Sequence, residues 1–276
     1  MNEPDHRRRV ASARTLLFVP GHRPDRFAKA AAAGADGIVL DLEDAVAPHT
    51  KDEARDHVLA WLSDGNTGIV RINAPATPWY DRDVAALADR PRTVMLPKAE
   101  RPDQIADLLA RLPPGSSVVP LLETAAGVLD ARAVLAVPGV IRAGFGSVDL
   151  AAELGVDPDD STALAYTRSH LVLASAAAGV APPLDGVTTA LHDEGALVID
   201  AERAATLGYT GKLCVHPRQV PAVNGVFTPS DAEREQAREI VRAAADRAAD
   251  GAVTVVNGRM VDRPVLEWAR RLLSRP

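Results

Sequence analysis

Residues 37–62 read GIVLDLEDAVAPHTKDEARDHVLAWL: a short apolar run, a polar loop and then an amphipathic stretch. This order is typical of a buried strand followed by a crossover helix. The same unit recurs with few interruptions from Thr15 to about Val220. Eight candidate strands can be counted, at Thr15–Pro20, Gly37–Leu42, Gly68–Asn73, Thr93–Pro97, Ser117–Glu123, Val140–Gly146, Pro183–Val187 and Lys212–Val215.

Eight strand and helix units in succession favour a closed (β/α)8 TIM barrel. The expected helices between the strands include Arg23–Ala33, Asp52–Leu62, Asp103–Arg111, Ala125–Leu135, Thr162–Ala178 and Glu194–Leu207. An open doubly wound sheet uses the same alternation, and periodicity alone does not exclude it. The glycine fingerprint of dinucleotide-binding folds is missing, however. A chain of 276 residues with 47% hydrophobic positions is long enough for one barrel domain.

The pattern changes after the eighth unit. We expect a helix at Asp231–Arg247, a hairpin of Ala252–Val256 and Arg259–Val261 around Asn257-Gly258, and a helix at Pro264–Leu273. Such a helix-hairpin-helix extension needs another surface for its apolar faces, which suggests a lid or interface arm. The predicted organisation is a disordered tail over residues 1–13, a catalytic barrel over 14–228 and the extension over 229–276.

Composition excludes several classes of partner. Thirty-one Lys and Arg against 37 Asp and Glu leave a net charge of −6, which offers no electrostatic footprint for nucleic acid or an anionic membrane. No hydrophobic span of membrane length is present in the sequence. The single cysteine, Cys214, excludes an internal disulfide framework and a multi-cysteine metal site. We therefore expect a cytoplasmic protein that acts on a small molecule.

Charged residues follow five consecutive predicted strands, at the rim where barrel enzymes carry their chemistry. They are Asp41, Glu43, Asp44, Arg71, Lys98, Glu123 and Asp149. Carboxylates gathered on one face repel one another unless a cation lies among them, and oxygen ligands suit Mg²⁺. We expect Glu123 and Asp149 to bind the metal, and the three carboxylates after strand two to orient metal-bound waters. The alternatives for Glu123 and Asp149 are a salt bridge to Arg71 or a helix cap at Thr124 or Ser147.

Other rim residues allow two interpretations each. Arg71 suits bidentate binding of a carboxylate or a thioester oxygen, or else it pairs with Asp41 or Glu43. Arg23 and Lys29, with Phe18 before them, lie where a helix start favours phosphate, or else they are solvated basic residues. A Schiff-base lysine is disfavoured, because Glu100 lies near Lys98 and because Lys212 begins its strand.

The same segments resemble the citrate lyase β-subunit family, within the wider group of malyl-CoA lyases and HpcH/HpaI aldolases. The matching phrases occur in family order across nearly the whole chain. They are Leu17-Phe18-Val19-Pro20-Gly21 with Arg23-Pro24, Leu40-Asp41-Leu42-Glu43-Asp44-Ala45-Val46, Val70-Arg71-Ile72-Asn73, Leu96-Pro97-Lys98, Glu123-Thr124-Ala125-Ala126-Gly127, Phe145-Gly146-Ser147-Val148-Asp149, His216-Pro217 and Met260-Val261-Asp262.

The resemblance implies a (β/α)8 barrel in which Glu123 and Asp149 hold Mg²⁺ while Arg71 and Glu123 contact the acid substrate. It implies coenzyme A near Phe18, Arg23 and Lys29. It also implies a homotrimer or hexamer in which the extension of one subunit covers its neighbour's site and supplies Asp262 as the catalytic acid/base.

The implied activity is Mg²⁺-dependent cleavage of a 3-hydroxyacyl-CoA, of citramalyl-CoA, malyl-CoA or citryl-CoA type, to acetyl-CoA and a 2-oxo acid. The alternatives are a citrate lyase β subunit acting on citryl-acyl carrier protein within a complex, a CoA thioesterase or malate-synthase-like enzyme, and a non-catalytic barrel.

Overall fold

The computed structural model describes residues 3–246, 254–256 and 259–275. The chain divides into two compact units, Met1–Phe227 and Thr228–Pro276. The division lies one residue before the boundary expected between the barrel and the extension. Each unit is described by itself below.

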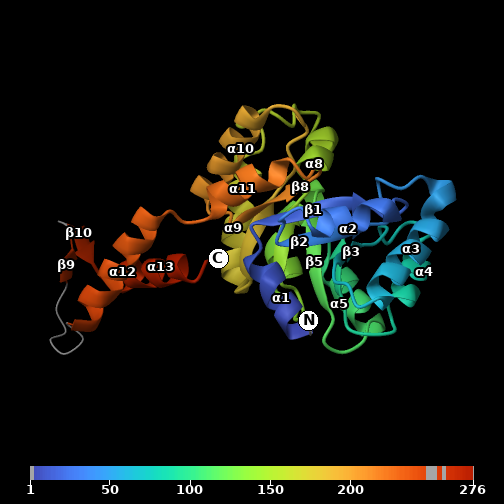
Figure 1. Cartoon of the computed structure of the whole chain (residues 1–276), viewed down its shortest axis with the longest axis horizontal. Helices are drawn as coiled ribbons and strands as arrows, with labels where there is room; N and C mark the ends of the chain where they lie inside the picture. Colours follow the sequence, from blue (N-terminus) through green and yellow to red (C-terminus); the bar gives the residue numbers. More distant parts are fainter. Residues whose placement is uncertain (1–2, 247–253, 257–258, 276) are drawn as a thin grey trace. The chain divides into compact units, whose positions relative to one another are not determined.

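The first unit is a closed barrel of parallel strands in sequential order, and the predicted TIM-barrel fold is thus confirmed. Figure 1 draws strands of this unit as arrows among its helices. The strands are β1 Thr15–Pro20, β2 Gly37–Asp41, β3 Ile69–Arg71, β4 Thr93–Leu96, β5 Ser117–Leu122, β6 Arg142–Phe145, β7 Ala181–Asp185 and β8 Gly211–Cys214. All eight lie within two residues of a predicted strand at each end. Long apolar runs mark them because both faces of each strand are buried.

Alternate residues of each strand enter two different hydrophobic layers. Leu16, Val39, Ile69 and Leu213 belong to a cluster built almost entirely of strand residues, which fills the barrel interior. Their neighbours along the strands pack instead against residues of the surrounding helices. The period of two in a strand therefore decides which side chains face the barrel axis and which face the helices.

Helices surround the barrel, with short 3₁₀ turns at Pro24–Arg26 and Pro48–Thr50. They are α2 Phe27–Ala31, α3 Lys51–Ser63, α4 Tyr80–Ala86, α5 Pro102–Arg111, α6 Ala125–Leu129, α7 Ala131–Leu135, α8 Ser147–Leu154, α9 Ala165–Ala178, α10 Glu194–Leu207 and α11 Gln219–Phe227. The helix expected over Ala125–Leu135 is divided at Asp130, which ends α6 and begins α7.

The N-terminal segment is helical, so the disordered tail expected over residues 1–13 is wrong for the described part of it. Helix α1 spans Glu3–Ser12. Its Val10 and the following Ala13 are buried in the interior cluster. The guanidinium of Arg142, at the start of β6, donates to the carbonyls of Val10 (3.2 Å) and Ala13 (2.8 Å). The helix thus closes the end of the barrel where the strands begin. The run of arginines at residues 7–9 had suggested a solvated tail, although Val10 and Ala13 beside it belong to the core.

The second unit contains α12 Asp231–Asp246, the antiparallel strands β9 Thr254–Val256 and β10 Arg259–Val261, and α13 Arg263–Leu273. This is the predicted order of elements, although the Asn257-Gly258 turn lies outside the described residues. The core of the unit consists of Ala237, Ile240, Val261, Ala269 and Leu272. Across the described residues of both units, no helix has the length and apolar character to cross a membrane.

Candidate active site at the carboxyl ends of the strands

The strand period brings three rim side chains to the mouth of the barrel. Asp41 and Arg71 each follow an interior residue by two positions, and the register of β2 and β3 pairs them directly. Glu123 likewise follows the interior residue Leu121 by two positions. These polar groups therefore continue the interior face of the barrel beyond its apolar core.

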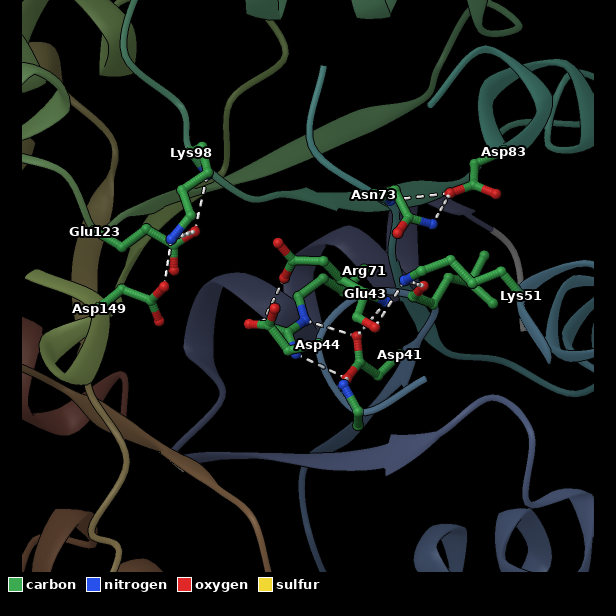
Figure 2. A network of polar contacts seen from close by, with 12 residues as sticks. Asp41, Glu43, Asp44, Lys51, Arg71, Asn73, Asp83, Lys98, Glu123 and Asp149 are labelled. Carbon is green, nitrogen blue, oxygen red and sulfur yellow. Dashed lines mark hydrogen bonds and ion pairs between the residues drawn. The ribbon is translucent and has the colours of Figure 1, made fainter. Parts of the chain in front are cut away.

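Arg71 forms the centre of an acidic cluster, visible in Figure 2. Its Nε and Nη2 donate to the two carboxylate oxygens of Asp41, each at 2.7 Å. Its Nη1 lies 2.9 Å from Glu43 Oε2 and 3.6 Å from the Asp44 carboxylate. The ring of Phe18 lies 4.7 Å from the guanidinium carbon. Pairing with Asp41 and Glu43 was one of the two interpretations of Arg71, and it fixes the orientation of the guanidinium.

Glu43 is the most perturbed carboxylate of this cluster. Burial raises its pKa to about 8, although the charge of Arg71 opposes that shift. Its Oε2 has no hydrogen-bond donor in good alignment among the described residues, despite the short ion pair. The backbone around it is held by Lys51, whose Nζ donates to the carbonyls of Leu42 and Glu43, each at 2.9 Å. A fixed loop thus presents a carboxyl group that exchanges a proton near neutral pH.

A third set of contacts supports the end of β3. Asp83 on α4 accepts hydrogen bonds from the backbone N–H (2.9 Å) and the side-chain amide (2.6 Å) of Asn73. Arg55 on α3 donates to the other oxygen of Asp83 at 2.8 Å. The sequence analysis had not singled out Lys51, Arg55 or Asp83. Their residue types at helix positions resemble ordinary surface charges, and only the fold brings them to the rim.

Glu123 and Asp149 converge on a single positive charge, the ammonium of Lys98 (Figure 2). Lys98 Nζ hydrogen bonds to Asp149 Oδ1 and lies 3.4 Å from Glu123 Oε1, which also accepts the Lys98 backbone N–H at 2.9 Å. Burial raises the pKa of Glu123 to about 7, although Lys98 opposes the shift. Burial likewise disfavours the Lys98 ammonium, but Asp149 and Glu123 outweigh it and raise the pKa of Lys98.

The chain approaches Glu123 closely at Gly146. A Cβ at that position would lie 2.3 Å from Glu123 Cβ, so no larger residue fits without displacement. Gly146 is the N-cap of α8, which carries Asp149 in its first turn. The glycine therefore lets the end of β6 bring one carboxylate beside the other. The neighbouring Thr124 caps α6 by accepting from Gly127 N, so this cap does not engage Glu123.

The remaining predicted residues make contacts of their own. Arg23 pairs with Asp25 at 2.7 Å, and Lys29 is exposed on α2. His216 accepts a hydrogen bond from Arg218 N through Nδ1 at 3.2 Å, a local turn contact. Asp262 belongs to the second unit, where it is exposed and caps α13 by accepting from Val265 N at 3.2 Å.

The geometry of Glu123 and Asp149 fits a hard divalent cation. Both carboxylates already hold one cationic group between them, which serves as a stand-in for a metal ion. No three His, Cys, Asp or Glu side chains gather in metal-binding arrangement within the described ranges. Mg²⁺ commonly takes only one or two protein carboxylates and completes its shell with water and substrate oxygens. Two carboxylates therefore make a sufficient protein contribution for this ion.

A (β/α)8 barrel with charged side chains gathered at the carboxyl ends of its strands has the architecture of the barrel enzymes, which carry their active sites at this rim. Residues 14–217 match the family model described as HpcH/HpaI aldolase/citrate lyase. The chain belongs to the HpcH/HpaI aldolase/citrate lyase family and is an enzyme of the lyase class.

Relatives match the chain over nearly its whole length. A citrate lyase subunit beta-like protein of Deinococcus radiodurans is 38% identical over 279 residues, covering 96% of this chain and 97% of the relative. A (3S)-malyl-CoA thioesterase of Cereibacter sphaeroides is 34% identical, covering 95% and 94% respectively. The crystal structure of CitE from Mycobacterium tuberculosis with magnesium, acetoacetate and coenzyme A has a TM-score of 0.80 and 36% identity, covering 96% of this chain and 98% of that one.

Proposed function

We propose that this chain is a Mg²⁺-dependent carbon–carbon lyase that cleaves a 3-hydroxyacyl-CoA to acetyl-CoA and a 2-oxo acid. The observation that carries the proposal is the convergence of Glu123 and Asp149 on one cation, beside an arginine held in fixed orientation. The similar CitE structure contains magnesium and coenzyme A, which supports the choice of metal and of thioester. Since CoA thioesters are intracellular metabolites and the chain has one cysteine, we expect the reaction in the cytoplasm.

Glu123 and Asp149 are the proposed metal ligands, and Glu123 also borders the acid substrate. When bound, Mg²⁺ supplies Lewis acidity toward substrate oxygens and a template that aligns the bond to be broken. Asp41 is committed to Arg71 through both oxygens, so its proposed role is to orient that arginine. Glu43 and Asp44 remain the proposed acceptors of hydrogen bonds from metal-bound waters, which they would orient.

Arg71 is the proposed group that stabilises negative charge on the departing thioester fragment. Asp41 holds one edge of its guanidinium, while other N–H groups point toward the side of Glu43 and Asp44. A charge fixed before the reaction stabilises a developing enolate without reorganisation during the step. Phe18, Arg23 and Lys29, along and after β1, are the proposed contacts of coenzyme A, with the two basic residues toward its phosphates.

Asp262 is the proposed acid/base that protonates this fragment, supplied to the site of a neighbouring subunit in a homotrimer or hexamer. Its exposed carboxylate on the small second unit suits such a role. The core of that unit is small as far as the structure describes it, so the unit would gain stability by covering another surface.

The experiment follows acetyl-CoA and free CoA released from citramalyl-CoA, malyl-CoA and citryl-CoA by the purified chain, with Mg²⁺ and with EDTA. We expect acetyl-CoA with Mg²⁺ and none with EDTA. Glu123→Gln and Asp149→Asn should lower kcat by about 100-fold or more, whereas the control Asp103→Asn, on an exposed carboxylate paired with Arg101, should not. Retained Mg²⁺-dependent turnover in either site variant would contradict the ligand assignment.

A second candidate is hydrolysis of the thioester, favoured by the similarity to the (3S)-malyl-CoA thioesterase. Free CoA in place of acetyl-CoA would identify it. Activity confined to an acyl-carrier-protein thioester, in the presence of partner subunits, would identify a citrate lyase β subunit instead.

A further inference from the structure

Lys98 combines two features that an ordinary surface lysine lacks. Its ammonium contacts both proposed metal ligands, and its backbone has a φ of 50°. Among the described residues it is the one non-glycine residue with a positive φ. L-residues rarely adopt this left-handed conformation, and strained backbone of this kind persists where the surrounding structure requires it.

The strained conformation directs two donors of one residue at one acceptor. The backbone N–H of Lys98 donates to Glu123 Oε1 at 2.9 Å, and the ammonium of the same residue lies 3.4 Å from that oxygen. The ammonium continues to Asp149, so the side chain spans both carboxylates. Glu123 is almost completely buried beside a second carboxylate, and Lys98 is the positive charge that offsets this most.

A Mg²⁺ ion on Glu123 and Asp149 would lie close to the ammonium, which contacts one oxygen of each carboxylate. The repulsion between two cations at such short range in a partly buried site disfavours the presence of both. The side chain of Lys98 is 35% exposed, so its flexible stem has room to withdraw toward the mouth of the barrel.

We propose that Lys98 is a positioning residue: a resident counter-charge that holds Glu123 and Asp149 together and competes with the divalent cation for them. The proposal rests on the proposed function, since it takes these carboxylates as the metal site. Lys98 then keeps the ligands assembled between turnovers and makes the metal exchangeable. Its removal strengthens metal binding, which is the opposite of what the loss of a merely structural lysine produces.

The test is a titration of the purified full-length chain with MnCl₂, in which the electron paramagnetic resonance signal of free Mn²⁺ gives Kd. Mn²⁺ shares the oxygen-rich octahedral preference of Mg²⁺. We expect Lys98→Met to lower Kd by about tenfold or more, since one full positive charge leaves the ion's immediate surroundings. Lys98→Arg keeps the charge and should stay within about threefold of the wild type. Arg101→Ala, which removes a more distant charge from the same loop, is the matched control.

Lys98→Gly removes the side chain but keeps the backbone N–H, and glycine adopts this backbone conformation freely. Its Kd for Mn²⁺ therefore tests the proposal if the methionine variant does not fold. An unchanged or higher Kd in the folded Lys98 variants, with Mn²⁺ bound by the wild type and lost in Glu123→Gln, would overturn the role of Lys98 alone. A wild type that binds no Mn²⁺, or a Glu123→Gln variant that binds it equally well, would instead overturn the metal site and the proposed function with it.

Discussion

Two lysines of the barrel, Lys98 and Lys212, each contact a pair of carboxylates, but in different layers of the molecule. Lys212 on β8 lies 3.1 Å from Asp185 and 2.7 Å from Asp200, and its side chain is completely buried. Lys98 lies at the mouth of the barrel with about a third of its side chain exposed. The same arrangement of charges therefore occurs once inside the protein and once at its surface.

Strand alternation explains the difference. Lys212 precedes the interior residue Leu213, and Asp185 follows the interior residue Leu184, so both point outward into the helix layer. There Arg168 on α9 donates to Asp185 at 2.9 Å, and Asp200 on α10 completes the set. Every charge meets a partner from another element, and the network ties helices to strands. At the mouth, by contrast, one side of the charged set stays open to a ligand.

The largest effect is expected where the lysine is buried. Lys212→Met should lower the free energy of unfolding by about 3 kcal/mol, because removal of one partner leaves a buried carboxylate without full compensation. Arg168 still contacts Asp185, which keeps the loss toward the lower end of the usual range. Guanidinium unfolding of the variant and the wild type measures it. Lys98→Met is the comparison variant and should cost less than Lys212→Met, because Asp149 is partly exposed to water and Glu123 keeps the backbone N–H of residue 98 as a donor. Equal losses at both lysines would remove the distinction between the two layers.

The next prediction concerns pH and the other rim cluster. Burial raises the pKa of Glu43 to about 8, from an ordinary value of 4.5 in the unfolded chain. Between these values the folded state retains a proton that the unfolded state releases, so the contribution of this group to stability falls as pH rises from about 4.5 to 8. Relative to the wild type, the free energy of unfolding of Glu43→Gln should therefore rise by about 3 kcal/mol between pH 5.5 and pH 8.5.

Chemical unfolding at the two pH values measures that gain. The control is Glu53→Gln, which changes an exposed glutamate on α3 and should show no such difference. If the free energies of unfolding of Glu43→Gln and the wild type change equally with pH, Arg71 keeps Glu43 ionised throughout. The rim carboxylates would then be fully paired, as those around Lys212 are.

The strands and the rim carboxylates could be predicted because both depend on short-range pattern. An apolar run buried on both faces marks each strand, and the residue after it falls at the rim. Helix α10 was predicted with its observed bounds, Glu194–Leu207, where Asp193 caps the start and a left-handed Gly208 follows the end. Helices α4, α8 and α11 were not among the named expectations, because seven to nine residues contain too few turns to show a clear period.

Partners distant in sequence could not be predicted. The ion-pair partner of Glu123 and Asp149 is Lys98, whereas the sequence suggested Arg71 as the alternative to a metal. Nothing in the local sequence around Lys98 indicates its left-handed backbone, and the residues it contacts, Glu123 and Asp149, are distant in sequence. The pairing of Lys212 with Asp185 and Asp200 likewise follows from the register of β7 and β8 and from the placement of α10.

The smallest expected effect isolates the backbone of Lys98 from its charge. Lys98→Gly and Lys98→Met both remove the ammonium, but only glycine adopts a φ of 50° without strain. Glycine should therefore be the more stable of the two by about 0.5–1 kcal/mol, or roughly 2 °C in Tm, after its greater flexibility in the unfolded chain is subtracted. The same pair at Lys29, inside helix α2, should show the opposite order because glycine destabilises a right-handed helix. If methionine is the more stable residue at position 98, the left-handed turn costs nothing, and the ion pairs alone account for the placement of the lysine between the two carboxylates.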